Sequence, residues 1–364
     1  MTDTDREAAV LDRIEAFRRR RPRFTDDVIT LAHGAGGKAS AALIDSVFLD
    51  AFTTTPEGHA VAPPSDAACL ALPGGGRLAF STDSFVVTPR RFPGGSLGHL
   101  AVHGTVNDLA MAGAQPAWLS AAFVIEEGFP VAELRELVAD MAEAARAAGV
   151  SIVTGDTKVV DRGAADGLYI TTAGIGIIPP GRRLGADLVH PGDRVIVSGT
   201  IADHGMAVML ARGDLALEAD IRSDTAALNG LTEALLAVAP RTRWLRDPTR
   251  GGVGTVCNEL AQACELGVVL DEHSLPVEPA VAGACDLLGI DPLYVANEGK
   301  LIAIVPEDEV GAALSALQAW PIGRDAAVIG EIVADPPGIV VLRTTFGGTR
   351  IVDMLVGDPL PRIC

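Results

Sequence analysis

Short apolar strands and helices alternate along most of this chain, and an aspartate stands beside several of the strands or on the helix that follows. These aspartates are Asp66, Asp83, Asp108, Asp156 and Asp247. Ligand sites of α/β sheets collect where strands end. Carboxylates gathered at such a place repel one another unless a cation lies between them. The pattern therefore predicts an α/β fold with an acidic ligand site, although any one of these aspartates is also typical of a turn or a helix cap.

The donor types favour magnesium over zinc. An oxygen-only set that phosphate and water can complete suits Mg²⁺. The chain has 5 cysteines with no CxxC pair. An odd number without such a pair argues against a zinc site or a disulfide framework and favours a reducing compartment.

Two glycine-rich segments are candidates for binding phosphate. Leu31–Lys38 precedes a helical pattern over Ser40–Phe48, so its backbone N–H groups and the Lys38 ammonium can surround phosphate oxygens. It lacks the Walker A spacing, and a flexible turn is the alternative. Arg246–Gly254 leads into a second predicted helix, Thr255–Glu265, in the same way.

A helix is predicted over Leu97–Met111, after a glycine-rich loop and before Gly113, and an amphipathic helix over Ala132–Ala148, which Gly149 caps. A buried strand is expected over Val150–Thr154, ending at the polar residues Gly155-Asp156-Thr157-Lys158. Glu298 stands just before the predicted strand Leu301–Val305 and is a candidate base, with a solvated turn carboxylate as the alternative. His204 is expected in a turn.

Size and charge narrow the class of protein. A length of 364 residues suggests about two domains. The net charge of −18 argues against nucleic acid or an anionic membrane as a partner. The sequence shows no signal peptide and no apolar run long enough to cross a membrane, so we expect a cytoplasmic protein. The predicted divisions are an extension over 1–27, an N-terminal α/β domain over 28–185, an α+β domain over 186–350 and a tail over 351–364.

The chain ends on Cys364 after a segment with Gly357, Pro359 and Pro361. Proline favours an extended run, and ten extended residues span about 30 Å. A thiolate is a nucleophile that can hold an acyl group. The tail is therefore a candidate carrier of a thiol-bound group, with a frayed terminus as the alternative.

Taken together, these motifs resemble the superfamily of aminoimidazole ribonucleotide synthetase and selenophosphate synthetase. Within it, the ending Pro361–Cys364 resembles that of the hydrogenase maturation carbamoyl dehydratases. The selenophosphate branch would require a reactive cysteine or selenocysteine in the first glycine-rich loop, and this loop has neither. The matching stretches are His33–Lys38, Ser65–Leu72, Ser81–Ser84, Thr105–Met111, Gly155–Val159, Asp247–Gly254 and Asn297–Lys300.

The resemblance implies an α/β plus α+β architecture of two domains, in which the N-terminal sheets of two chains pair into a β-barrel across a homodimer. It implies that ATP and Mg²⁺ bind between the domains. The implied metal ligands are Asp66, Asp83, Asp108 and Asp247. The implied ATP contacts are Gly36, Gly37, Lys38, Asn107, Asp156 and Thr157. The implied catalytic residues are Cys364, Glu298 as base and Lys158.

The implied activity is the ATP-dependent dehydration of a carboxamide on Cys364 to a thiocyanate. The implied partners are a carbamoyltransferase that loads Cys364 and an iron-carrying scaffold complex that receives the cyano group for [NiFe]-hydrogenase maturation. Two alternatives remain open: a small-molecule ATP ligase or kinase of the same superfamily, and a non-catalytic ATP-gated carrier.

Overall fold

The computed structural model describes residues 26–34, 37–52, 65–213 and 219–355, which fall into two compact units. The smaller unit holds the described residues up to 52 together with Leu355, and the larger unit holds the described residues from 65 to 354. Most of the predicted extension and the end of the tail, including Cys364, lie outside the described residues.

The smaller unit is helical. A 3₁₀ turn, Leu31–Gly34, is followed by helix α2 (Lys38–Leu43), a π-helical segment Ile44–Leu49 and the short α3 (Asp50–Phe52). The predicted helix over Ser40–Phe48 is therefore present, with a change of helical pitch inside it.

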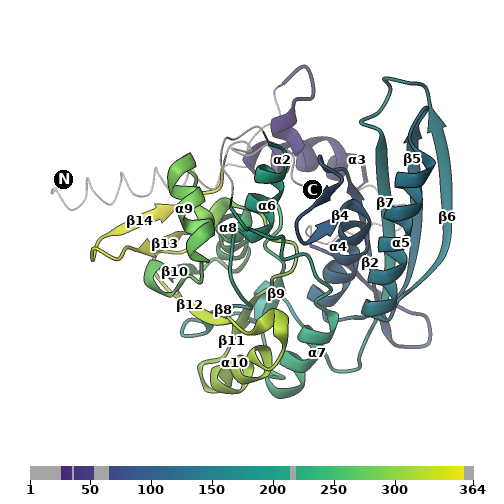
Figure 1. Cartoon of the computed structure of the whole chain (residues 1–364). Coiled ribbons are helices and arrows are strands. Elements are labelled where there is room, and N and C mark those ends of the chain that lie inside the picture. The colour runs from purple at the N-terminus through teal and green to yellow at the C-terminus, as the bar shows by residue number, and fades with distance from the viewer. Residues whose placement is uncertain (1–25, 35–36, 53–64, 214–218, 356–364) are drawn as a thin grey trace. The chain divides into compact units, whose positions relative to one another are not determined.

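The larger unit begins with a five-stranded sheet in the order β1-β2-β7-β5-β6 (Figure 1). All neighbouring pairs are antiparallel except β5 and β6, which are parallel. A small hairpin, β3 (Arg91–Phe92) and β4 (Gly95–Ser96), precedes the first long helix. The strands of the sheet are β1 (Ala68–Ala71), β2 (Arg77–Phe85), β5 (Gln115–Glu126), β6 (Ser151–Val160) and β7 (Leu168–Ile178).

Helices α4 (Leu97–Met111) and α5 (Val131–Ala148) pack together, and α4 also packs on β2 and β7. Apolar residues recur every three or four positions in α5, so one side of the helix is buried, including Leu137 and Met141. Gly149 ends α5 in the left-handed conformation, with φ of 73°. Nearly every residue of α4 is buried. Both helices lie where the sequence predicts them.

The second sheet has seven strands in the order β14-β13-β10-β12-β8-β11-β9. All neighbouring pairs are antiparallel except β10 and β13. The strands are β8 (Arg194–Val197), β9 (Trp244–Arg246), β10 (Gly267–Asp271), β11 (Ile302–Val305), β12 (Ala327–Val333), β13 (Val340–Arg343) and β14 (Thr349–Val352). The helices of this part are α6 (Asp203–Ala211), α7 (Asn229–Val238), α8 (Gly252–Cys264), α9 (Pro279–Leu288) and α10 (Val310–Gln318).

Strand β11 shows why its sequence is apolar at every position. Ile302 and Ile304 join the core that α8 covers, whereas Ala303 and Val305 join the core formed with α7 and α10. Successive side chains of a strand point to opposite faces, so a strand with helices on both faces needs apolar residues throughout.

Three predictions about single elements were wrong. Strand β2 runs on to Phe85, so Asp83 lies inside the strand rather than after it. Strand β6 includes Gly155-Asp156-Thr157-Lys158 and is exposed along almost its whole length rather than buried, because it is the edge strand and the described chain covers little of either of its faces. His204 lies in α6 and is fully buried.

Among the helices of the described residues, none is both long enough and apolar enough to cross a membrane.

Candidate functional site

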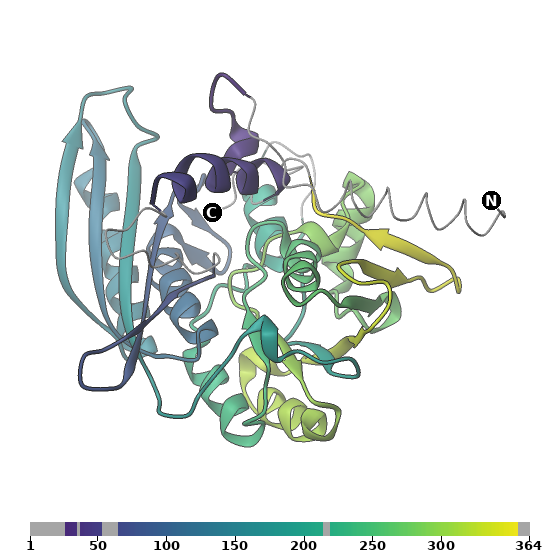
Figure 2. The same ribbon diagram turned by 180° about the vertical axis from the view of Figure 1, so that it is seen from behind.

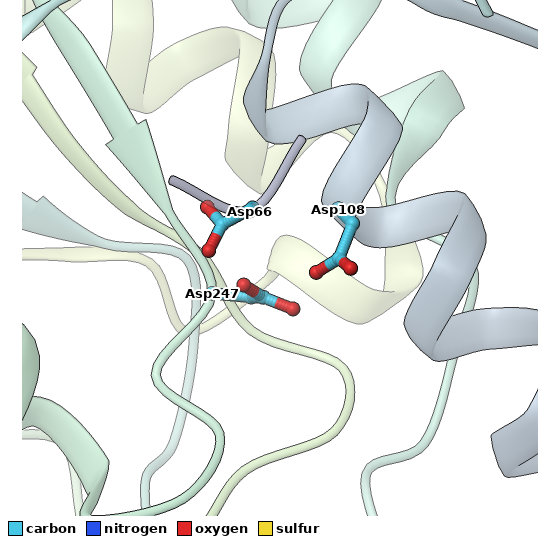
Figure 3. Close-up of side chains that lie close together, drawn as sticks. All are labelled: Asp66, Asp108 and Asp247. Atoms are coloured by element: carbon cyan, nitrogen blue, oxygen red, sulfur yellow. The ribbon is translucent and has the colours of Figure 1, made fainter. Parts of the chain in front are cut away.

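Three aspartates from distant parts of the sequence converge in the larger unit (Figure 3). Asp66 precedes β1, Asp108 is on α4, and Asp247 directly follows β9. One carboxylate oxygen from each lies within 4.8 Å of the others. The convergence that the sequence pattern predicts is therefore present for these three residues, which we call the acidic cluster.

The acidic cluster carries a charge that the surrounding protein only partly compensates. Loss of water contact on burial, and then repulsion between its members, raises the pKa of Asp66 and that of Asp108 well above their usual range. Burial raises the pKa of Asp247 to about 6. The Arg246 guanidinium lies 2.8 Å from Asp66 Oδ1 and 3.1 Å from Glu259 Oε2.

This arrangement fits a divalent cation. The three groups offer only oxygen donors, which Mg²⁺ prefers, and Ser81 Oγ donates a hydrogen bond to Asp108 Oδ2 that fixes one of them. A cation placed among the carboxylates would remove the repulsion that raises their pKa values.

A cavity of about 160 Å³ adjoins the acidic cluster. Asp108 and Asp247 line it together with Glu298, whose side chain comes from the turn before β11. Glu298 is 4% exposed, and burial followed by the charges of Asp247 and Asp83 raises its pKa well above the usual range. The full lining is Asp83, Ser84, Phe85, Gly104, Asp108, Asp247, Thr249, Arg250 and Glu298. A carboxylate in such a position can accept a proton from a ligand held beside the acidic cluster.

Other predicted site residues lie apart from this cavity within one chain. Asp156, Thr157 and Lys158 are on β6 and are exposed. Three strand spacings of about 4.8 Å separate β2 from β6, which places their backbones about 14 Å apart. The paired register across the sheet is Asp83, Thr172, Ala121 and Gly155.

Asn107 lies next to Asp108 but is 1% exposed. Its side-chain amide donates to the carbonyls of Ala226, at 3.0 Å, and Glu298, at 3.3 Å. Its Oδ1 accepts from the N–H of Leu228 at 2.8 Å. The amide is thus engaged by the chain itself, and the predicted contact of Asn107 with ATP stays a prediction.

The first glycine-rich loop belongs to the smaller unit. Gly37 is the residue before α2, and Lys38 begins that helix with its N–H donating to Leu355 O at 3.0 Å. His33 is buried, with Nε2 2.9 Å from Asp26 Oδ2. Gly36 and Cys364 lie outside the described residues.

The glycines of the second glycine-rich segment serve packing. A Cβ at Gly252 would lie 2.5 Å from Leu293 O, and one at Gly254 would lie 2.8 Å from the Tyr294 ring. The close approach of a backbone carbonyl at Gly252 and of an aromatic ring at Gly254 therefore favours glycine at these two positions.

Sequence reasoning assigned no role to Arg246 and Glu259, although Arg246 directly precedes Asp247 and could have been noticed for that reason. It also missed Asp224, which accepts a hydrogen bond from the N–H of Glu298 at 3.0 Å. Nothing in the local sequence around Asp224 indicates a partner 74 residues away.

Two models of one protein superfamily match this chain. The model for the N-terminal domain of AIR synthase related protein matches residues 64–178, and the model for the C-terminal domain matches residues 190–343. The predicted two-domain fold of this superfamily is therefore confirmed.

Individual relatives define the family. The chain is 56% identical to carbamoyl dehydratase HypE of Rhodobacter capsulatus over 339 residues, which are 93% of this chain and 99% of that protein. This chain belongs to the HypE family of AIR synthase related proteins, as the sequence resemblance predicted.

Two solved structures of the family are similar to the fold described above. A HypE–HypF complex matches with a TM-score of 0.79 and 47% identity over 86% of this chain and all of that chain, at 100%. A HypE structure in complex with ATP matches with a TM-score of 0.76 and 44% identity, covering 93% of this chain and 100% of that chain.

Proposed function

We propose that this chain is an ATP-dependent carbamoyl dehydratase that converts a carboxamide on the sulfur of Cys364 into a thiocyanate. The product would supply cyanide ligands for the iron centre of [NiFe]-hydrogenase. One observation carries the proposal: Glu298, a buried carboxyl group, faces the same cavity as two members of the acidic cluster, in a chain of the HypE family.

The reaction needs a phosphoryl donor that activates the amide oxygen and a base that removes protons from the amide nitrogen. Amide oxygen is a poor leaving group, so the carboxamide oxygen attacks the γ-phosphorus of ATP and ADP departs. The carbon–oxygen bond then breaks with loss of phosphate as the nitrogen gives up its two protons and a carbon–nitrogen triple bond forms. The balance is carboxamide plus ATP giving thiocyanate, ADP and phosphate.

The residues of this chain divide the work. Glu298 Oε would take a proton from the nitrogen, and the raised pKa of Glu298 makes it a stronger base than an exposed carboxylate. Asp66, Asp108 and Asp247, with Asp83 from the lining of the cavity, would hold Mg²⁺. When bound, Mg²⁺ offsets charge on the phosphates. Lys158 would stabilise the oxyanion side, and Asp156 and Thr157 would contact the nucleotide.

The remaining ATP contacts are proposed by family position. Gly36, Gly37 and Lys38 would surround phosphate oxygens, and a HypE structure that contains ATP supports nucleotide binding by this chain.

A homodimer is proposed because the five-stranded sheet leaves apolar surface uncovered. Phe80 is 41% exposed and Trp118 48%, and both lie on the sheet face away from α4. Such a surface, continuous with an edge strand, suits pairing with the same sheet of a second copy into a β-barrel.

Two further partners are proposed. The complex of a relative with HypF supports a protein partner for this chain. We propose that this partner is the carbamoyltransferase that loads Cys364. The second is an iron-carrying scaffold complex that accepts the cyano group. The net charge of −18 gives no support for nucleic acid as a partner.

Replacement of Cys364 tests the proposal. Full-length protein is incubated with the carbamoylating partner and Mg-ATP, and its intact mass is measured. The unaltered chain should gain a carboxamide and then lose one water only when ATP is present. Cys364→Ala should do neither, whereas Cys69→Ala, which changes an exposed cysteine on β1, should behave like the unaltered chain. A carboxamide mass that ATP leaves unchanged would refute the dehydratase.

A further inference from the structure

The peptide of Glu298 is held from both sides. Its N–H donates to Asp224 Oδ1 at 3.0 Å. Its carbonyl accepts from Asn107 Nδ2 at 3.3 Å and from the N–H of Ala226 at 3.4 Å. With both backbone groups fixed, the Glu298 carboxylate can move only by rotation about its own side-chain bonds.

Asp224 is itself fixed. Lys300 Nζ lies 3.2 Å from Asp224 Oδ2, off the line of a hydrogen bond, and the two side chains are 7% and 3% exposed. The backbone of Asp224 also packs closely against Gly299. A Cβ at residue 299 would lie 1.8 Å from Asp224 O. Only glycine beside Glu298 allows this approach.

The residues on either side of Asp224 are bound to two buried histidines. Ser223 Oγ lies 2.8 Å from His204 Nδ1, and Thr225 Oγ1 lies 3.0 Å from His103 Nδ1. Hydrogen bonds from two helices, α6 and α4, thus hold the segment that carries Asp224.

Asn107 links the same segment to the acidic cluster. Its amide donates to Ala226 O at 3.0 Å as well as to Glu298 O, and it directly precedes Asp108 on α4. One turn of helix therefore carries both a cluster carboxylate and a contact to the Glu298 peptide.

We propose that Asp224 and Asn107 are positioning residues that fix Glu298 at the cavity in register with Asp108. This proposal rests on the proposed role of Glu298 as base. A base must lie within hydrogen-bond reach of its proton, and a displacement of about 1 Å can cost about 100-fold in rate. Neither residue needs to touch the substrate to have this effect.

Three full-length variants test the proposal. Asp224→Ala removes the acceptor of the Glu298 N–H and should lower kcat for dehydration about 100-fold while the KM for ATP stays unchanged. The double variant Asp224→Asn with Lys300→Met keeps an oxygen acceptor and removes both buried charges, and it should recover most of the rate. Asp220→Ala, at an exposed position of the same segment, is the control and should match the unaltered chain.

Hydrogen exchange of the Glu298 amide gives a readout that does not depend on activity. The Asp224→Ala variant should exchange about tenfold faster, the factor expected for loss of one hydrogen bond, and Asp220→Ala should not. Unchanged exchange in Asp224→Ala would overturn the proposed contact. Faster exchange with unchanged kcat would overturn the positioning role, as would a double variant that folds but stays as slow as Asp224→Ala. If the unaltered chain does not dehydrate the carboxamide, the proposed function fails instead, and hydrogen exchange still tests the contact.

Discussion

At the scale of single residues, the acidic cluster shows how burial and charge act together. Asp66, Asp108 and Asp247 are each held where water is scarce, so each binds its proton more tightly than an exposed aspartate does when no cation is near. The pKa of an ordinary exposed aspartate is about 4. The difference means that repulsion between the ionised carboxylates destabilises the folded chain, and a bound cation would remove this repulsion.

The stability of the metal-free protein should therefore depend on pH in a definite direction. The folded-state pKa of Asp247, about 6, exceeds its unfolded value. Between about pH 4 and pH 6 the folded state binds more protons than the unfolded chain, so stability falls as pH rises through this window. Thermal unfolding in EDTA at pH 5 and pH 7.5 measures the fall, and Mg²⁺ should reverse it at pH 7.5. A Tm that rises with pH across this window in EDTA would contradict the prediction.

Asp108→Asn separates repulsion from metal binding. It keeps an oxygen that can accept from Ser81 but removes one charge. The metal-free Tm should rise by about 2 to 4 °C, the shift expected for about 1 kcal/mol, whereas the increase caused by Mg²⁺ should disappear. Asp187→Asn, an exposed residue outside the cluster, should change neither quantity. If the Tm of the variant in EDTA is lower than that of the unaltered chain and still rises when Mg²⁺ is added, Asp108 is not a metal ligand.

At the scale of elements, β6 has several apolar residues although it is exposed in a single chain. It carries Ile152, Val153 and Val159, all exposed, and no strand of the described chain pairs with its outer edge (Figure 2). An uncovered apolar edge strand is a place for strand pairing, and charged residues on such a strand oppose it.

Val153→Lys should therefore produce a monomer. Val153 is 60% exposed in one chain, so a lysine there costs little in the monomer but buries a charge in a sheet-to-sheet dimer. Light scattering after size exclusion measures the mass. Val131→Lys, at a similarly exposed position on α5 rather than on the sheet, is the matched control and should remain dimeric. A dimer that survives Val153→Lys would place the interface elsewhere.

At the scale of the whole molecule, the proposed catalytic groups of one chain are divided. Glu298 faces the cavity beside the acidic cluster, whereas Lys158 lies on the far edge strand β6, whose backbone is about 14 Å across the sheet from that of β2. A homodimer that pairs the sheets offers a way to bring Lys158 of one chain to Glu298 of the other. The predicted domain boundary between 185 and 186 stays a prediction.

Mixed dimers test this division. Lys158→Ala and Glu298→Gln should each be nearly inactive alone. If the two residues act across the dimer, exchange of subunits between the variants restores one complete site in each mixed dimer and about a quarter of full activity, since half of the dimers are mixed. A mixture that stays inactive after verified subunit exchange would show that both residues act within one chain.

The sequence by itself determined the helices α4 and α5, the family and the identities of the acidic cluster. The helical periodicity of α5 and the glycines that follow the two helices, Gly113 and Gly149, are local properties, and the aspartates stand in motifs that can be recognised without coordinates. Strand β6 could not be read in the same way, because its apolar residues look alike whether another layer covers them within the chain or not.

Only the tertiary structure decided which of the candidate residues meet. It brought Asp66, Asp108 and Asp247 to within 4.8 Å, placed Glu298 on the same cavity, and left Asp156 and Lys158 on a distant edge. It also placed Asp224 Oδ1 3.0 Å from the backbone nitrogen of Glu298. Such contacts depend on strand order and register, which are set by packing between segments far apart in the chain rather than by the residues adjoining each site.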